Sequence, residues 1–405
     1  MVLGLLLARA GVPVVVLEKH LDFLRDFRGD TVHPSTLEVL HELGLLDAFL
    51  QRPHDRVDEL RASYEGRTVP VADFTHLPSH SRFLVLMPQW EFLDFMYDEA
   101  RRYPGFELWT DAEAIGLLQE KGRVNGVKVR RDRRAGQPRE VELHASLVVA
   151  ADGRHSALRD AAALPHISYG APIDVLWMAI PRREEDPAST GGHIAGGRIL
   201  VTLNRGDYWQ CAFVIPKGGH DALKARGIGA FHREIGRIAP FLVDRLPAAL
   251  PDWDSVKLLE VTVDRLESWS CRGLLCIGDA AHAMSPVGGV GINLAVQDAV
   301  AAANLLWAAL AGDASDKEID ALLPQLQRRR EWPVQVTQAV QRFIQDNVLM
   351  AVLDREPPDR QAPLPLPLPL PLKLLARWPL LRRLPARAVG LGVRPEHVRS
   401  PDAGR

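Results

Sequence analysis

One segment near residue 275 restricts the possible folds of this chain more than any other. The apolar run Leu275-Cys276-Ile277 is followed by Gly278 and Asp279, and a turn rich in proline and glycine then leads into an apolar stretch at residues 291–310. The run predicts a buried strand, and the long stretch predicts a helix that is covered on all sides. Ligands bind at the carboxyl ends of parallel strands in α/β folds, so the turn predicts a binding site.

A second strand with a similar turn lies earlier in the chain. The apolar residues 147–151 are followed by Asp152 and Gly153, with Arg159 a few residues further on. The Asp-Gly pair allows close approach to the backbone, and an arginine can face a phosphate group. Taken alone this signal is weak, because many Asp-Gly pairs form plain turns.

Residues 1–18 predict the second half of a βαβ unit. Residues 1–10 are typical of a helix, with Gly4 as a small residue that allows close packing on a sheet, and Gly11 is typical of its C-terminal cap. Residues 12–18 predict a buried parallel strand that ends in an acidic residue, Glu18. A dinucleotide-binding unit places such a residue under the adenosine ribose.

Composition excludes several classes of protein. The 49 basic and 51 acidic residues give a net charge of −2, which does not favour nucleic acid as a partner. The three cysteines form no C-x-x-C pair, and no H-E-x-x-H motif or hydrolase nucleophile turn is present, so a metal site and hydrolysis are not expected. Asn304 interrupts the longest apolar stretch, so we expect no transmembrane segment and a cytoplasmic protein. Residues 1–7 are apolar like a signal peptide, but no basic residue precedes them.

The C-terminal part has an unusual composition. Residues 363–372 repeat Pro-Leu five times, which favours an extended polyproline II linker and not a helix. Residues 373–394 hold six basic residues and no acid among leucines. We expect these leucines to pack on the rest of the protein, and a weak peripheral membrane contact is the alternative.

Together, the two turns resemble those of the p-hydroxybenzoate hydroxylase-like family of FAD-dependent monooxygenases, and the resemblance covers nearly all of residues 1–350. It implies that Asp152, Gly153 and Arg159 serve the FAD pyrophosphate and the nicotinamide cofactor. It also implies that Gly278 and Asp279 hold the ribityl chain. The remaining cofactor-binding residues that it implies are Glu18 at the adenosine ribose, Arg28 and Gln89 at the FAD, and Gly289, Gly291 and Asn293 near the flavin ring.

Two residues are candidates for a catalytic role by the same resemblance. Pro286 corresponds to the proline beside the isoalloxazine ring, and His282 to a residue common in the family. A structural hydrogen bond is the favoured role of His282, with proton transfer as the alternative. His33, which precedes Pro34, is typical of a helix cap.

The predicted fold is an α/β Rossmann-like FAD-binding domain built from discontinuous segments, with an inserted, mostly β substrate domain and a Pro-Leu-rich C-terminal tail. The FAD-binding domain is expected at residues 1–70, 89–165 and 265–350. The substrate domain is expected at residues 71–88 and 166–264, and the linker and basic tail at residues 351–405.

The function implied is insertion of one oxygen atom from O2 into a small organic substrate, aromatic or polyketide-like, with FAD reduced by NADH or NADPH. A reductase or dehydrogenase on the same fold and a truncated, non-catalytic remnant are the alternatives. A halogenase is disfavoured, because residues 176–181 lack the paired tryptophans that related families place before Ile-Pro. The oligomeric state is left open.

The family's first strand and its G-x-G-x-x-G turn are missing from the sequence. Our hypothesis is that Met1 is an internal methionine and that an upstream reading frame encodes a valine-rich strand and a glycine triplet. Without that strand, residues 12–18 lose their central parallel neighbour.

Overall fold

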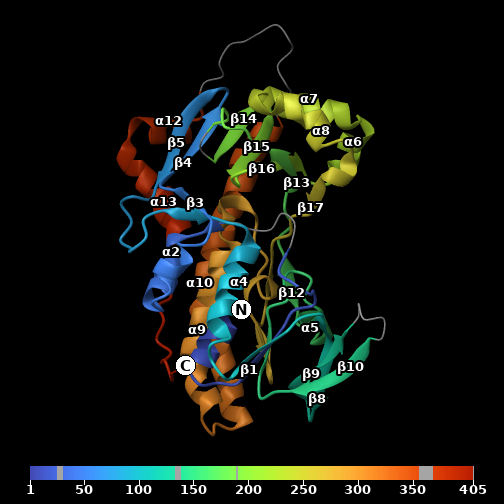
Figure 1. Ribbon diagram of the computed structural model, residues 1–405, viewed down its shortest axis with the longest axis vertical. Coiled ribbons are helices and arrows are strands. Elements are labelled where there is room, and N and C mark those ends of the chain that lie inside the picture. Colours follow the sequence, from blue (N-terminus) through green and yellow to red (C-terminus); the bar gives the residue numbers. More distant parts are fainter. Residues whose placement is uncertain (25–30, 133–137, 188–189, 355–367, 405) are drawn as a thin grey trace.

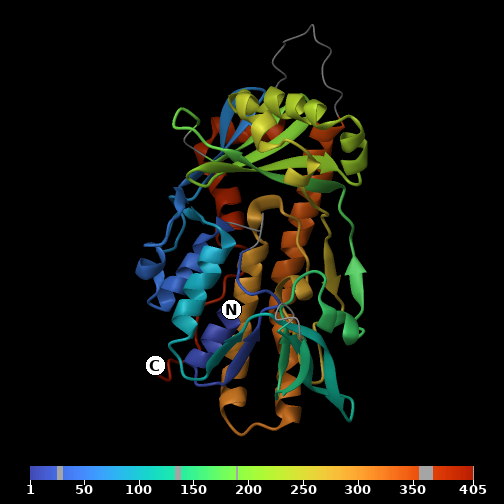
Figure 2. The ribbon, with the colours of Figure 1, turned by 45° about the vertical axis from the view of Figure 1, so that its right-hand side comes forward.

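The computed structural model describes residues 1–24, 31–132, 138–187, 190–354 and 368–404. Two long helices run side by side through the molecule, a large sheet covered by helices lies at one end, and a smaller antiparallel sheet lies near the other (Figures 1 and 2). This arrangement is a mixed α/β fold.

The N-terminal unit forms as the sequence predicts. Helix α1 (Val2–Arg9) leads through Gly11, whose φ of 82° suits glycine, into strand β1 (Val14–Leu17), which pairs in parallel with β7 (Phe106–Trp109). A Cβ atom on Gly4 would lie 2.8 Å from Val16 Cγ2, so the close packing of this helix on the strands requires glycine. The strand is half-buried and not fully buried as predicted.

The two predicted ligand-binding strands lie side by side. Strand β11 (Val148–Ala150) pairs in parallel with β20 (Leu274–Cys276), and β19 (Ser270–Cys271) completes that sheet. Within the described residues, β1 pairs only with β7, and β11 only with β20. The parallel strands therefore form two separate sheets, whereas a Rossmann-like domain predicts one.

Two helices form the central support. Helix α9 (Gly291–Ala311) packs against α1 and against α10 (Asp316–Ile344), which begins with a capping box between Ser315 and Glu318. After α10 the chain continues as a π-helical turn, η6 (Gln345–Leu349), and then as α11 (Met350–Leu353).

In the part of the chain that the structure describes, one helix is long and apolar enough to span a membrane. It covers residues Val287–Ala311, and 56% of its most apolar window is buried inside the protein. The helix is therefore only partly the one predicted to be covered on all sides, because residues 304–311 are mostly half-buried or exposed.

A seven-stranded sheet lies at one end of the molecule, in the order β17-β13-β16-β15-β14-β4-β5. Its long central strands are β13 (Ile173–Pro181), β16 (Tyr208–Pro216) and β15 (Arg198–Asn204). The other four are β17 (Lys257–Leu259), β14 (Gly191–Ala195), β4 (Glu59–Tyr64) and β5 (Arg67–Asp73). One face is covered by the helical insert predicted around residues 220–245, namely α6 (His220–Ala225), α7 (Ile228–Ile238), η2 (Pro240–Arg245) and α8 (Leu246–Ala249), with η3 (Trp253–Ser255) after it.

Smaller elements connect these parts. A three-stranded sheet contains β2 (Thr31–Val32), β6 (Leu84–Leu86) and β3 (Asp55–Val57), close to helices α2 (Pro34–Glu42), α3 (Leu46–Phe49) and α4 (Gln89–Ala100). A second one contains β10 (Arg139–His144), β9 (Arg123–Arg131) and β8 (Ala112–Glu120), and β12 (His166–Ser168) pairs with β18 (Asp264–Leu266). The remaining short helices near the ligand-binding strands are α5 (Ala157–Ala161), η4 (Gly278–Ala280) and η5 (Val287–Gly289).

The C-terminal segment packs on the protein. Helices α12 (Leu370–Arg377) and α13 (Arg383–Gly390), with η7 (Pro379–Arg382) between them, lie beside β4 and β5 (Figure 1). Some of the predicted leucine packing is present, but Leu370, Leu380 and Leu384 are exposed. Beyond α13 the chain crosses the central helices, where Glu396 pairs with Arg329 and Arg330.

Two local predictions were wrong. Asn125-Gly126, predicted as a hairpin turn, lies inside β9, and the turn falls at Lys121 and Gly122, which have φ of 49° and 73°. Gly126 serves strand packing instead, because a Cβ atom there would lie 2.3 Å from the carbonyl oxygen of Leu143.

The Pro-Leu repeat was also expected to avoid a helix, but α12 begins within it. Pro371 stands in the first turn of α12, where a missing N–H costs no hydrogen bond.

Candidate cofactor site

The Gly-Asp turn follows β20 as predicted and is tied to helix α9. Gly278 has a φ of 58°, and its N–H donates to Asp298 Oδ2 at 3.1 Å. A Cβ atom on Gly278 would lie 3.0 Å from Ala295 Cβ, so the turn and the helix can approach this closely only with glycine. The next side chain, Asp279, is thereby held at the end of the strand.

The carboxylate of Asp279 is accessible. Its side chain is 31% exposed, and its one ion pair among the described residues is a long contact of 3.4 Å to Arg154 Nη2. A Cβ atom on Gly291 would lie 3.9 Å from Asp279 Oδ1, which places this carboxylate beside the first residue of α9. An accessible carboxylate at this place can accept hydrogen bonds from ligand hydroxyl groups.

The N-terminus of α9 is open. Its N-cap, Val290, provides no side-chain hydrogen bond, and Gly288 and Gly289 before it have φ of 79° and 61°. The free N–H groups and the dipole of a 21-residue helix favour negative charge at this end. Asp279, Gly289 and Gly291 therefore lie together, as the sequence predicted.

Pro286 is held in place by α10. Gln341 Nε2 donates to the carbonyl oxygens of Ser285 and Val287, at 2.8 Å each. Gln338 Nε2 makes the equivalent bond to Ala283 at 3.1 Å. Sequence reasoning missed these glutamines, although their spacing of three along a helix was a usable signal.

Asn293 links the glycine turn to helix α2. Its Oδ1 accepts hydrogen bonds from His33 N at 3.0 Å and from Thr36 Oγ1 at 2.7 Å. His33 is the N-cap of α2, as predicted, but by backbone position and without a side-chain cap bond. Its Nδ1 donates to the carbonyl oxygen of Val389 at 2.7 Å instead. Burial, opposed by that bond, lowers the pKa of His33 to about 4, so the ring is neutral at pH 7.

His282 is part of a buried charged cluster. Its Nε2 lies 2.6 Å from Asp298 Oδ2, and Arg330 Nε donates to Asp298 Oδ1 at 3.0 Å. Burial alone would raise the pKa of Asp298, but His282 and Arg330 outweigh it and hold that pKa below its ordinary value. Since His282 is 1% exposed, this geometry favours the structural role over proton transfer.

The second turn lies beside the first. Asp152 is exposed after β11, and Gly153 has a φ of 89°. Ser156 caps α5 by accepting from Arg159 N at 3.1 Å. Arg159 is 5% exposed, and its Nε and Nη1 form no hydrogen bond among the described residues, although they lie 3.5 Å from Asp160 Oδ1 and 3.7 Å from Asp264 Oδ2, respectively. The guanidinium therefore already faces two carboxylates, and its remaining hydrogen-bonding capacity suits an anionic group.

Two of the other predicted residues belong to other elements. Glu18 follows β1, and its carboxylate accepts from His20 N at 2.9 Å. Gln89 opens α4, as predicted, and is half-buried. Arg28 lies outside the described residues.

The residues present fit a flavin at the ribityl and ring end. An accessible carboxylate, an open helix N-terminus and two glycines in the left-handed region meet there. The buried donors of Arg159 add a charged group at the neighbouring turn.

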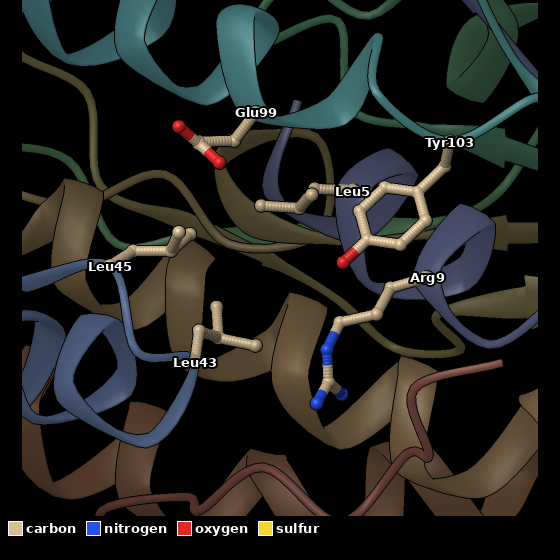
Figure 3. A pocket seen from close by; sticks show the side chains of 6 residues that line it. All are labelled: Leu5, Arg9, Leu43, Leu45, Glu99 and Tyr103. Carbon is tan, nitrogen blue, oxygen red and sulfur yellow. The ribbon is translucent and has the colours of Figure 1, made fainter. Parts of the chain in front are cut away.

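Two cavities lie away from these turns. Figure 3 shows one of about 10 Å³, lined by Leu5, Arg9, Leu43, Leu45, Glu99 and Tyr103. The other is lined by residues of α3 and α4, including Phe95 and Asp98, and by residues that follow these helices, including Arg52. No residue predicted from the sequence lines either cavity, so we assign no ligand to them.

Known proteins resemble this chain over most of its length. The model of the FAD binding domain family matches residues 1–339. The 6-methylpretetramide 4-monooxygenase of Streptomyces rimosus is 33% identical over 325 residues, which cover 79% of this chain and 76% of that protein. The uncharacterized aromatic compound monooxygenase YhjG of Bacillus subtilis is 24% identical over 335 residues, covering 78% of this chain and 60% of that protein.

Among solved structures, pqsL, a probable FAD-dependent monooxygenase from Pseudomonas aeruginosa, superposes with a TM-score of 0.70. It is 20% identical and covers 87% of this chain and 96% of that one. At 20% identity, this similarity shows only that the two proteins share a fold.

Proposed function

The chain belongs to the FAD binding domain family and is an FAD-dependent monooxygenase, and from that premise we propose that it hydroxylates a fused-ring aromatic or polyketide-like compound. The relative at 33% identity supports this substrate class, because its name gives such a compound, 6-methylpretetramide. When bound and reduced by NADH or NADPH, FAD supplies the reaction with O2, and one oxygen atom of O2 is transferred to the substrate.

The protein's contribution at the flavin begins with Asp279, which we assign to the ribityl hydroxyls. The backbone of Gly289 and Gly291 would leave room for the flavin ring at the start of α9, where the helix dipole would favour negative charge. Pro286, fixed by Gln341, lies beside the ring in this assignment. The main observation in support of this flavin site is that the accessible Asp279 carboxylate lies next to the open N-terminus of α9.

The remaining cofactor contacts follow the same assignment. Arg159, with Asp152 and Gly153, faces the FAD pyrophosphate and the incoming nicotinamide nucleotide. The buried guanidinium of Arg159 supports this, because its Nε and Nη1 make long ion pairs but no hydrogen bond among the described residues. Glu18 binds the adenosine ribose, and Gln89 contacts the FAD. His282 keeps the Gly-Asp turn in position through Asp298.

The division into domains is also part of the proposal. A Rossmann-like FAD-binding domain contains β1, β7, β11 and β20, and the seven-stranded sheet forms the wall of the substrate site and excludes water. Strands β4 and β5, at residues 59–73, extend that sheet, so we place them in the substrate domain, whereas the sequence predicted residues 1–70 in the FAD-binding domain.

The test is oxygen incorporation. The FAD-loaded protein, given NADPH or NADH, 6-methylpretetramide and ¹⁸O2, is expected to yield a product that carries one ¹⁸O atom. NAD(P)H oxidation that produces only hydrogen peroxide, with no labelled product from any fused-ring phenol tried, would show a reductase and contradict the proposal.

A further inference from the structure

Three glutamines form a column on one face of α10 and its continuation. Gln338, Gln341 and Gln345 follow at intervals of three and four, so they lie above one another on the same side of the helix. Their exposed fractions are 2%, 3% and 0%, respectively. A column of buried amides needs a hydrogen-bond partner for each member.

The amide nitrogens of the first two members have their partners in the chain, while Gln341 Oε1 has none among the described residues. Gln338 Nε2 donates to the carbonyl oxygens of Asp264 and Ala283, at 2.8 and 3.1 Å. Gln341 Nε2 donates to the carbonyl oxygens of Ser285 and Val287, on either side of Pro286. The column therefore follows the segment that leads to the predicted flavin ring.

The third member has none. Neither Nε2 nor Oε1 of Gln345 has a hydrogen-bond partner among the described residues, although the side chain is fully buried. An unpaired buried amide costs about 1–3 kcal/mol. Gln345 is also the first residue of the π-helical turn η6, and such turns are frequent at functional sites.

The sheet beside this turn adds two more unpaired donors. Leu349, Val352 and Leu353 pack on Ile173, Ile199 and Val214, which lie on the sheet face opposite helix α7. Because side chains alternate along strands, Trp177 of β13 and Gln210 of β16 share that face. Trp177 Nε1 and Gln210 Nε2 are buried without a partner in the described structure, and Gln210 is 4% exposed.

We propose that Gln345 is a substrate-binding residue, and that its free amide pairs with a donor–acceptor edge of the substrate, such as an enol beside a carbonyl or a carboxamide. Trp177 and Gln210 supply further donors to substrate oxygens from the sheet face. The inference rests on the proposed function, since it places the substrate beyond Pro286 and names the polar groups that it must carry. An amide offers both a donor and an acceptor, so a hydrocarbon surface alone does not satisfy it.

The test compares Gln345→Met with wild type in the FAD-loaded protein, because methionine keeps the length of the side chain and removes its hydrogen-bonding atoms. Gln335→Met, at an exposed position of α10, is the matched control. If the variant fails to retain FAD, Gln345→Leu serves for the same comparison. The two readouts are the Tm without substrate and the Kd of 6-methylpretetramide, measured by fluorescence titration.

We expect Gln345→Met to raise the Tm of the substrate-free protein, because it removes an unpaired amide, and to weaken 6-methylpretetramide binding about 10- to 100-fold. A lower Tm with unchanged Kd would show an amide that serves only the fold and would overturn the inference. If wild type incorporates ¹⁸O into another fused-ring phenol but does not bind 6-methylpretetramide, the Kd is measured with that phenol. Failure of wild type to incorporate ¹⁸O into any of them refutes the proposed function separately.

Discussion

Replacing His33 by asparagine tests how the glycine turn is held against the rest of the protein. His33 is 0% exposed, its backbone N–H donates to Asn293 and its Nδ1 donates to the carbonyl oxygen of Val389. Asparagine places an amide nitrogen near the position of Nδ1, so the variant can keep this hydrogen bond and does not titrate.

The magnitude follows from the pKa of His33. In the folded protein this pKa is about 4, lowered from 6.5 chiefly by burial. Between these values the unfolded chain binds one proton more than the folded one, so stability falls as the pH falls from 6.5 towards 4. A difference of about 2.5 units at 1.36 kcal/mol each amounts to roughly 3 kcal/mol.

The assay is the free energy of unfolding in urea, measured from about pH 7.5 down to about pH 4 for wild type and His33→Asn. Wild type is expected to lose about 3 kcal/mol more than the variant over this range. His76→Asn, at an exposed histidine, is the control and should follow wild type. Parallel curves for wild type and His33→Asn would refute the reasoning, whatever the constant offset between them.

Three further predictions concern the turns. Asp279→Ala should weaken FAD binding about 10- to 100-fold in a fluorescence titration and leave the apoprotein's stability within about 0.5 kcal/mol, and FAD binding equal to wild type would contradict the assignment. Asp298→Asn should cost about 3–5 kcal/mol in urea unfolding, because it leaves the buried Arg330 with only its longer ion pair of 3.4 Å to Glu396, while Asp313→Asn on the surface should cost almost nothing. Gly289→Ala should cost about 1–2 kcal/mol in the same assay, since φ is 61° and the new Cβ atom would lie 3.2 Å from Thr31 Oγ1; a neutral effect would show that this turn relaxes freely.

The sequence predicted the elements that depend on local pattern. The strand before Gly278, the helix that begins at Gly291 and the helix at Gln89 all form where periodicity and glycine placed them. The prediction of a hairpin turn at Asn125-Gly126 was wrong, because it relied on the turn preference of a dipeptide. In the folded chain, packing of β9 against Leu143 outweighs that preference.

The links that hold the turns together were not predictable from local pattern. His33 and Asn293 lie 260 positions apart, and Arg330 and Glu396 lie 66 apart, so only the folded chain brings them into contact. The unpaired amide of Gln345 is likewise a property of its surroundings and not of its neighbours in sequence.

The most direct test of the cofactor assignment is the visible absorbance of the purified 405-residue chain after incubation with FAD and gel filtration. We predict the paired absorbance bands of bound oxidised flavin at one FAD per chain, and their loss in Asp279→Ala at the same protein concentration. A folded, colourless wild-type protein, or an Asp279→Ala variant that retains the full flavin spectrum, would contradict the account.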